Sequence, residues 1–184
     1  MALETFRSTL WSKFGKALTV LIAVAFVGSM ARGMFFPGGS TPRLEKGRDL
    51  PRTQLIDVES GKPLRLESLR GRPVLINFWA TWCGYCVKEL PMLEGLHRRF
   101  GDSVAMLAVT EEELPKVRYW LGQAGAPHVT FPVIYDPGNG LGAQLGVRKI
   151  PFTVFLDRAG RVAHDVTGVV PESEAVERLE ALLK

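Results

Sequence analysis

The sequence has little of the two residue types that most often bind transition metals. Of its 184 residues, only two are cysteines and three are histidines. A structural zinc site needs four ligands, most of them cysteine or histidine. The histidines are scattered at positions 97, 128 and 164, and there is no second cysteine pair. The sequence therefore predicts no metal ligands, and we expect no cofactor.

Clusters of basic side chains are also absent from most of the chain. The net charge is +4, and residues 1–40 account for +3 of it. In the remainder, the largest basic clusters are pairs such as Arg98-Arg99 and Arg148-Lys149. A nucleic-acid-binding face needs lysine and arginine gathered on the folded part of a protein. We therefore expect no nucleic-acid partner.

Near the N-terminus, an uncharged apolar run over residues 17–31 follows Lys13 and Lys16. In helical form this run spans about 22 Å, and extension to Phe36 reaches roughly the 30 Å of a bilayer's hydrocarbon core. Because the basic residues precede the run, the positive-inside rule leaves the N-terminus in the cytoplasm and places the rest outside it. We expect residues 1–36 to be a membrane anchor.

A cleaved signal peptide is one alternative for this segment, with Ser29 and Ala31 as the small residues before the cut. A buried core helix is the other. The anchor and the signal peptide both place the remainder outside the cytoplasm, where a dithiol can cycle through a disulfide. Residues 37–52 are rich in glycine, proline and charge and predict a linker. Residues 53–184 are the predicted folded domain.

Within this domain, strand-like and helix-like segments alternate. Strands are predicted at QLIDV, KPLRL, PVLINFWA, VAMLAVT, FTVFLD and VAHDVTG, and a short strand or extended segment at FPVIY. Helices are predicted at residues 83–100, 111–125 and 172–183, and a helical turn at NGLGAQLGV. The first two and the last two strands are predicted hairpins. The nearly continuous apolar run PVLINFWA is typical of a buried central strand. The order predicts an α/β fold with helices on both faces of a central mixed β-sheet, preceded by the N-terminal hydrophobic helix.

Both cysteines lie in the segment NFWATWCGYC, where the buried strand ends and the next helix begins. We expect Cys83 to be the first helical residue and Cys86 to lie one turn further in. Free N–H groups and the positive dipole end of a helix stabilise a thiolate. The pattern therefore predicts a lowered pKa for Cys83 and makes it the attacking sulfur. At this spacing the two sulfurs share a helix face and can close a disulfide.

A dithiol–disulfide cycle follows from that placement. The Cys83 thiolate attacks a partner disulfide, and Cys86 then attacks Cys83 and releases the reduced partner. A permanent structural disulfide is the weaker interpretation, because so short a loop constrains the unfolded chain very little.

Together with Pro91 and the later segment KIPFTVFLDRAG, this stretch resembles the thioredoxin superfamily, and most of all its exported, membrane-anchored TlpA/ResA-like thiol–disulfide oxidoreductases. The resemblance covers about Gly47 to Lys184. It implies a thioredoxin-like fold and reduction of disulfides in exported proteins, with a membrane thiol-electron transporter as the reductant that this branch commonly uses. Disulfide oxidase or isomerase activity is one alternative, and reduction dedicated to cytochrome c maturation is another.

The resemblance also implies roles for residues beside the cysteines. Trp82 would shield the attacking sulfur from solvent. Gly84 and Tyr85 would tune thiolate stability, and Tyr85 would either donate a hydrogen bond or cover the disulfide. Pro151 matches the proline that follows a cis peptide bond in this family. The main chain of Ile150 would then be offered to an extended substrate segment.

Several positions depart from related patterns. Asn77 and Met106 stand where cytoplasmic thioredoxin has a buried acid and a buried lysine, so the usual proton acceptor is missing. Glu89, one turn past Cys86, could assist deprotonation of that thiol; a surface or capping charge is the other interpretation. Phe152 stands where reductases for cytochrome c maturation often carry glutamate, which weakens that alternative.

Two further classes are disfavoured. A peroxidase of the peroxiredoxin type would have threonine three residues before its cysteine, where this chain has Ala80. A copper-carrying module of related fold usually has three residues between its cysteines and a histidine ligand downstream, whereas two residues separate the cysteines of this chain.

The anchor hypothesis predicts where the protein is found in the cell. Membrane fractions should retain it, and protease added to spheroplasts should digest the cysteine-containing domain, because the lysines hold only the N-terminus inside. A mature N-terminus at Arg32 would show a cleaved signal peptide instead. Protein that fractionates with the cytoplasm and resists the protease would contradict both interpretations.

Overall fold

The computed structural model describes residues 46–49 and 53–184. The predicted anchor, residues 1–36, and most of the predicted linker, residues 37–52, lie outside the described residues. Among the described helices, none is both long enough and apolar enough to span a membrane.

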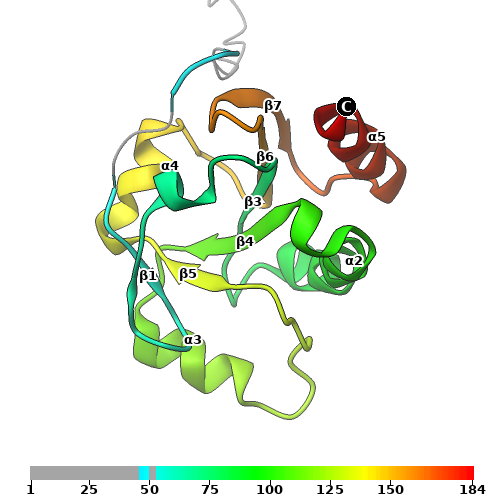
Figure 1. The fold of residues 1–184 in the computed structure, drawn as a ribbon. Helices are drawn as coiled ribbons and strands as arrows, with labels where there is room; N and C mark the ends of the chain where they lie inside the picture. The colour runs from blue at the N-terminus through cyan, green and yellow to red at the C-terminus, as the bar shows by residue number, and fades with distance from the viewer. Residues whose placement is uncertain (1–45, 50–52) are drawn as a thin grey trace, which may run out of the picture. The chain divides into compact units, whose positions relative to one another are not determined.

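In the described part of the chain, seven strands form one mixed sheet in the order β2-β1-β5-β4-β3-β6-β7 (Figure 1). They are β1 (Leu55–Asp57), β2 (Pro63–Leu64), β3 (Val74–Phe78), β4 (Ala105–Thr110), β5 (Val133–Tyr135), β6 (Phe152–Leu156) and β7 (Val162–Thr167). Strands β3, β4 and β5 run parallel to one another, and the other neighbouring pairs are antiparallel. The predicted strands and both predicted hairpins are confirmed, and the segment FPVIY contains β5.

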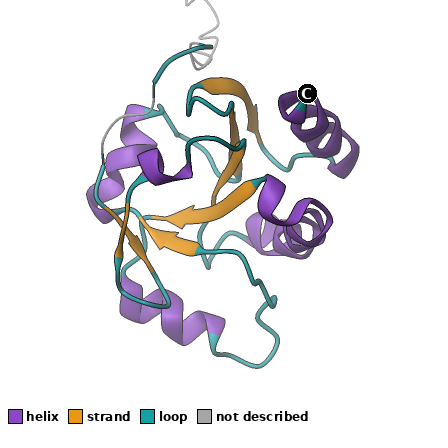
Figure 2. Cartoon of the chain, in the orientation of Figure 1, coloured by secondary structure: helices purple, strands orange, loops and turns teal. Residues whose placement is uncertain are grey.

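The described helices surround this sheet (Figure 2). They are α2 (Gly84–Phe100), α3 (Leu114–Leu121), α4 (Gly140–Gln144) and α5 (Glu172–Leu183), with short 3₁₀ turns η1 (Leu66–Leu69), η2 (Gly101–Ser103) and η3 (Pro137–Asn139). The prediction for α5 is confirmed. The prediction of a helix over 111–125 was too long at both ends. Pro115, which lacks an N–H, fits only the first turn of α3, and Gly122 caps its other end.

Alternation along β3 divides the core into two layers. Val74, Ile76 and Phe78 pack in one cluster with residues of η1 and α4. Leu75 and Trp79 pack in the other, with residues of α2, α3 and α5. Successive side chains of a strand point to opposite faces, and every residue of β3 is buried because both faces are covered. The expected central sheet with helices on both faces is confirmed.

The connection between β3 and α2, residues 79–83, lies at the carboxyl ends of the parallel strands. The N–H of Trp79 donates to the carbonyl of Val109 near the end of β4, at 3.0 Å. Open α/β sheets bind their ligands outside this edge. The fold therefore places both cysteines where the sheet is open to a partner.

Leu93, on the sheet-facing side of α2, is completely buried. We expect Leu93→Ala to lower the free energy of unfolding by about 2–5 kcal/mol, because the lost side chain leaves a cavity. Urea unfolding measures this difference. Val169→Ala is the control: the Val169 side chain is 48% exposed, so its loss should change stability by less than about 0.5 kcal/mol. Equal effects would contradict the described packing of α2.

Candidate active site

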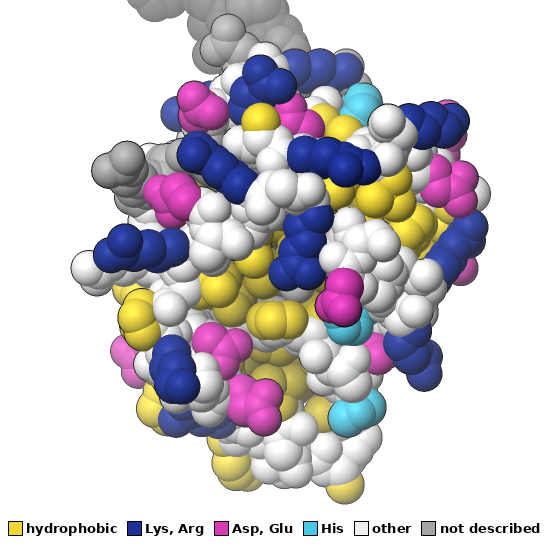
Figure 3. Space-filling model, in the orientation of Figure 1, with side chains coloured by type: hydrophobic (Ala, Val, Ile, Leu, Met, Phe, Trp, Pro, Cys, Tyr) yellow, Lys and Arg dark blue, Asp and Glu magenta, His cyan; other side chains and the backbone are white. Residues whose placement is uncertain are grey.

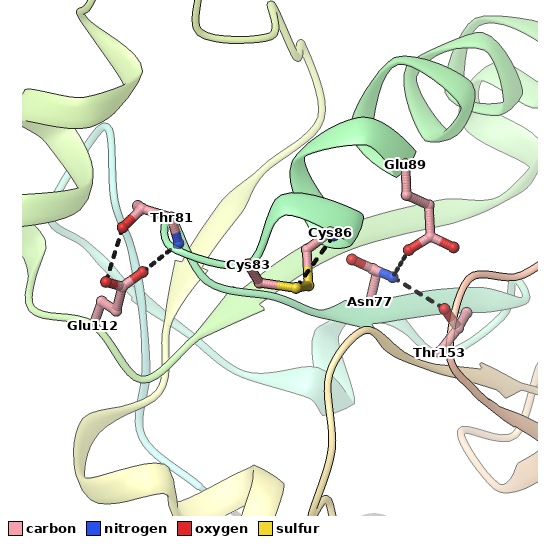
Figure 4. Close-up of a disulfide and its surroundings, with 7 residues drawn as sticks. All are labelled: Asn77, Thr81, Cys83, Cys86, Glu89, Glu112 and Thr153. Carbon is pink, nitrogen blue, oxygen red and sulfur yellow. Dashed lines mark hydrogen bonds between the residues drawn. A yellow bond between two sulfur atoms is a disulfide. The ribbon is translucent and has the colours of Figure 1, made fainter.

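Cys83 and Cys86 form a disulfide at the start of α2, with their Cα atoms 5.2 Å apart (Figure 4). The expectation that Cys83 is the first helical residue was wrong: it is the N-cap, with extended backbone angles of φ −86° and ψ 98°. Its sulfur accepts a hydrogen bond from the Cys86 N–H at 3.2 Å. An N-cap side chain accepts from this position of the first turn. The sulfur thus caps the helix directly.

Both cysteines are buried, but not to the same degree. Cys83 is 7% exposed, whereas Cys86 is completely buried. Trp82 and Tyr85, on either side of Cys83, are exposed over 70% and 72% of their surfaces. Gly84 between them is also exposed. A partner can therefore meet Cys83 and a rim of aromatic surface, and the predicted shielding and substrate-binding roles of this rim stay predictions.

Residues 150 and 151 lie at the same edge of the sheet as the cysteines. The Ile150–Pro151 peptide bond is cis, as the resemblance implied. Phe152, the next residue, pairs with Phe78 at the end of β3, and this register brings Pro151 close to the connection that carries Cys83. Pro151 is buried, and Ile150 is partly exposed. The structure thus brings together the residues that the sequence nominated in two distant segments.

Glu89 lies on the buried face of α2, with only 3% of its surface exposed. Its carboxylate accepts hydrogen bonds from the Asn77 side chain at 3.0 Å and from the Val170 N–H at 2.7 Å. The same Asn77 amide also donates to the hydroxyl of Thr153 at 3.0 Å (Figure 4). The interpretation of Glu89 as a surface or capping charge was therefore wrong.

Burial raises the pKa of Glu89, although the hydrogen bonds from Val170 and Asn77 partly oppose this effect. The side-chain oxygen of Asn77, Oδ1, is buried and has no hydrogen-bond partner among the described residues. In Figure 4 this oxygen points to the side of Asn77 on which the disulfide lies. The sequence analysis predicted no contact between Asn77 and Glu89, because that contact depends on how α2 packs over β3.

Glu112 was missed by sequence reasoning. It lies in the connection between β4 and α3 and accepts two hydrogen bonds from Thr81, from the N–H at 2.6 Å and from the hydroxyl at 2.9 Å. Burial would raise its pKa, but the hydrogen bonds from Lys116 and Thr81 outweigh this and lower it. Three glutamates stand in a row here, and only the spacing to Lys116 distinguishes Glu112 from its neighbours.

A hollow of about 490 Å³ lies beside the cysteine turn, with Trp79, Trp82 and Ile150 among its apolar lining. Arg148 and Lys149 line it too, together with acidic and further apolar residues.

One face of the molecule, shown in Figure 3, exposes hydrophobic side chains between basic and acidic ones. In residues 46–49 and 53–184, no three or more His, Cys, Asp or Glu side chains gather in a group that could hold a metal ion.

Comparison with known proteins identifies the family to which this chain belongs. Residues 45–183 match the redoxin family. The chain belongs to the redoxin family. The thiol-disulfide oxidoreductase ResA of Bacillus anthracis is 29% identical over 171 residues, which cover 92% of this chain and 93% of the relative. The thiol:disulfide interchange protein HelX of Rhodobacter capsulatus is 30% identical over 170 residues, with 90% and 93% covered.

Solved structures carry the same fold. The exposed lipoprotein thioredoxin Etrx1 of Streptococcus pneumoniae superposes with a TM-score of 0.65 at 26% identity, over 72% of this chain and all of that chain. The thioredoxin-like fold and the ResA-like resemblance are thus confirmed. A redoxin-family fold with a Cys-x-x-Cys disulfide at the N-terminus of α2 makes this chain a thiol–disulfide oxidoreductase.

Glu89 predicts a pH dependence of stability. Because its pKa is raised above the ordinary value of 4.5, its contribution to stability is full below pH 4.5 and is lost as pH rises through the raised pKa. We therefore expect Glu89→Gln to gain stability relative to the wild type over this pH interval. Urea unfolding of both proteins at a series of pH values measures the difference.

Glu94→Gln is the control for this measurement. Burial would raise the pKa of Glu94, but hydrogen bonds from the Thr130 N–H and hydroxyl lower it below its ordinary value. Its contribution is present above pH 4.5 and lost as pH falls through the lowered pKa, so its difference curve should slope the opposite way. Two curves with the same slope would contradict the assignment for Glu89.

Proposed function

We propose that this protein reduces disulfide bonds of exported proteins outside the cytoplasm, and that residues 1–36 anchor it in the membrane. The observation that carries the proposal is the asymmetry of the cysteine pair. Cys83 caps a helix N-terminus and keeps 7% of its surface exposed, whereas Cys86 is completely buried. Such a pair suits attack by one sulfur and resolution by the other.

The reaction runs in two exchanges. The Cys83 thiolate attacks one sulfur of the partner disulfide, forms a new S–S bond to it and expels the other partner sulfur as a thiolate. Cys86, deprotonated, then attacks Cys83, closes the Cys83–Cys86 disulfide and expels the second partner sulfur. The partner gains two electrons and the enzyme loses two. A membrane protein carrying a reduced dithiol is the class of donor that would return them by the same exchange.

Glu89 is the proposed proton acceptor for Cys86. It lies one helical turn beyond that cysteine, and a raised pKa suits a group that takes a proton near neutral pH. Asn77 links the two in this proposal. Its side-chain nitrogen donates to Glu89, and its unpartnered oxygen would accept a hydrogen bond from the Cys86 thiol once the disulfide is reduced. The buried amide thereby joins the thiol to the carboxylate.

Substrate binding is assigned to the rim of the cysteine turn. Trp82, Gly84 and Tyr85 are exposed around Cys83, and the main chain of Ile150 precedes Pro151 at the same edge. An extended segment of a partner would pair with this main chain, a mode of recognition that accepts many sequences. The apolar hollow behind Trp82 and Ile150 would take a side chain of that segment.

The two cysteines are tested by substitution in the full-length protein. Cys83→Ser should abolish the reduction of insulin, because the attacking sulfur is lost. Cys86→Ser should accumulate mixed disulfides with partner proteins, because nothing resolves them. In the reduced wild type, Cys83 should be alkylated roughly tenfold faster than Cys86 near pH 7, because it caps the helix N-terminus and is less completely buried than Cys86.

Full activity of Cys83→Ser, or equal alkylation of the two sulfurs, would contradict the mechanism. The direction of electron flow is read in cells. Cys86→Ser should trap exported proteins on Cys83, and the wild-type cysteines should become oxidised when the membrane reductant is depleted. Cysteines that become reduced on that depletion would instead show a disulfide oxidase. Apocytochromes as the only trapped partners would show a dedicated role in cytochrome c maturation.

A further inference from the structure

We propose that Glu112 is a positioning residue of the catalytic turn, which acts through Thr81 to hold Cys83 and Trp82 in their reactive arrangement. The inference rests on the proposed role of Cys83 as the attacking sulfur. It assigns a function to a carboxylate that contacts neither sulfur and that belongs to a different connection of the fold.

The cysteine turn is closed by a main-chain hydrogen bond from the Cys83 N–H to the Ala80 carbonyl, at 3.1 Å. Thr81 and Trp82 are the two central residues of this turn. Glu112 holds Thr81 at two points, one on the main chain and one on the side chain. Hydrogen bonds to a carboxylate are stronger than those between neutral groups. The carboxylate therefore fixes both the backbone and the rotamer of Thr81.

Glu112 is itself held firmly. Its side chain is almost entirely buried, and the Lys116 ammonium of α3 lies 2.5 Å from Oε1. Its N–H donates to the hydroxyl of Thr110, the last residue of β4, at 3.2 Å. We call the two hydrogen bonds from Thr81 to the Glu112 carboxylate a clamp. This clamp ties the catalytic turn to β4 and α3, so the turn is fixed by elements other than the helix α2 that it starts.

Two features of the site depend on this turn. The Cys83 sulfur must face the Cys86 N–H, a contact that stabilises the thiolate. The indole of Trp82 must keep its place in the lining of the hollow next to the cysteines, which Ile150 also lines. If Thr81 is released, the sulfur and the indole can both move. The expected consequences are slower attack by Cys83 and weaker docking of a protein substrate.

The protein contains a second clamp of the same chemistry, which serves as an internal control. Glu94 accepts hydrogen bonds from the Thr130 N–H at 2.8 Å and from its hydroxyl at 2.9 Å. Glu94 lies in α2, eight residues after Cys86, which is about 12 Å along a helix. This pair fixes the segment before β5, and among the described residues neither Glu94 nor Thr130 has a hydrogen bond to the cysteine turn.

The test compares Thr81→Val with Thr130→Val in the full-length protein. Each change removes one hydroxyl–carboxylate hydrogen bond of 2.9 Å and leaves the backbone bond and the charge in place. With Cys86→Ser present, Cys83 is the only thiol, and its alkylation rate is followed against pH. Thr81→Val should slow alkylation at pH 7 by roughly three- to tenfold and move the midpoint to higher pH. Thr130→Val should leave both unchanged.

Turnover and stability complete the comparison, with Cys86 restored. Thr81→Val should lower kcat/KM for insulin. Thr81→Ser, which keeps the hydroxyl, should have the turnover of the wild type and, in the Cys86→Ser background, the same alkylation midpoint as the protein with Thr81. Urea unfolding should show similar losses for the two valine variants, which separates positioning from stability. An unchanged alkylation profile in Thr81→Val, or an equal shift in Thr130→Val, would overturn the inference. Failure of the wild type to reduce insulin would instead overturn the proposed function, and the alkylation profiles would still decide the role of Glu112.

Discussion

The hydrogen bond from the Cys86 N–H to the Cys83 sulfur joins the fold to the chemistry. A helix leaves its first N–H groups without partners inside the helix, and something must satisfy them. Here the cap is a sulfur atom, so the same group that starts α2 is the one proposed to attack a partner disulfide. The buried strand β3 ends at Phe78, and a five-residue connection carries the chain from the sheet to this cap. Any shift of that connection changes the helix start and the sulfur together.

Two buried carboxylates, Glu89 and Glu112, lie near the cysteine pair, and their surroundings differ. Glu89 lies on the buried face of α2, where burial raises its pKa and the side chain of Asn77 donates a hydrogen bond to it. Glu112 lies beyond the turn, where Thr81 and Lys116 lower its pKa. The first is suited to taking a proton, and the second to remaining charged and rigid. The difference arises from the partners of each carboxylate, because a lysine and a backbone N–H compensate burial better than an amide and a backbone N–H do.

Access to the pair is controlled by its surroundings. Cys86 is completely buried, while Cys83 keeps 7% of its surface exposed and is flanked in sequence by the exposed rings of Trp82 and Tyr85. In the proposed mechanism, a protein disulfide therefore meets Cys83 first. The completely buried Cys86 would then attack only the sulfur that is already beside it, which would set the order of the exchange.

Local pattern in the sequence determined much of this molecule. The apolar run of β3, the two hairpins and the C-terminal helix follow from periodicity and turn residues, and the cysteine spacing at a strand-to-helix junction indicates redox chemistry without any structure. The boundaries of α3 and the capping role of Cys83 were misjudged by a few residues, because helix ends depend on which groups satisfy the free N–H donors. Tertiary structure alone decided that Glu89 is buried against Asn77 and that Glu112 holds Thr81. Those contacts join residues 12 and 31 positions apart, and no local pattern encodes which of several neighbouring glutamates will face a strand, a turn or the solvent.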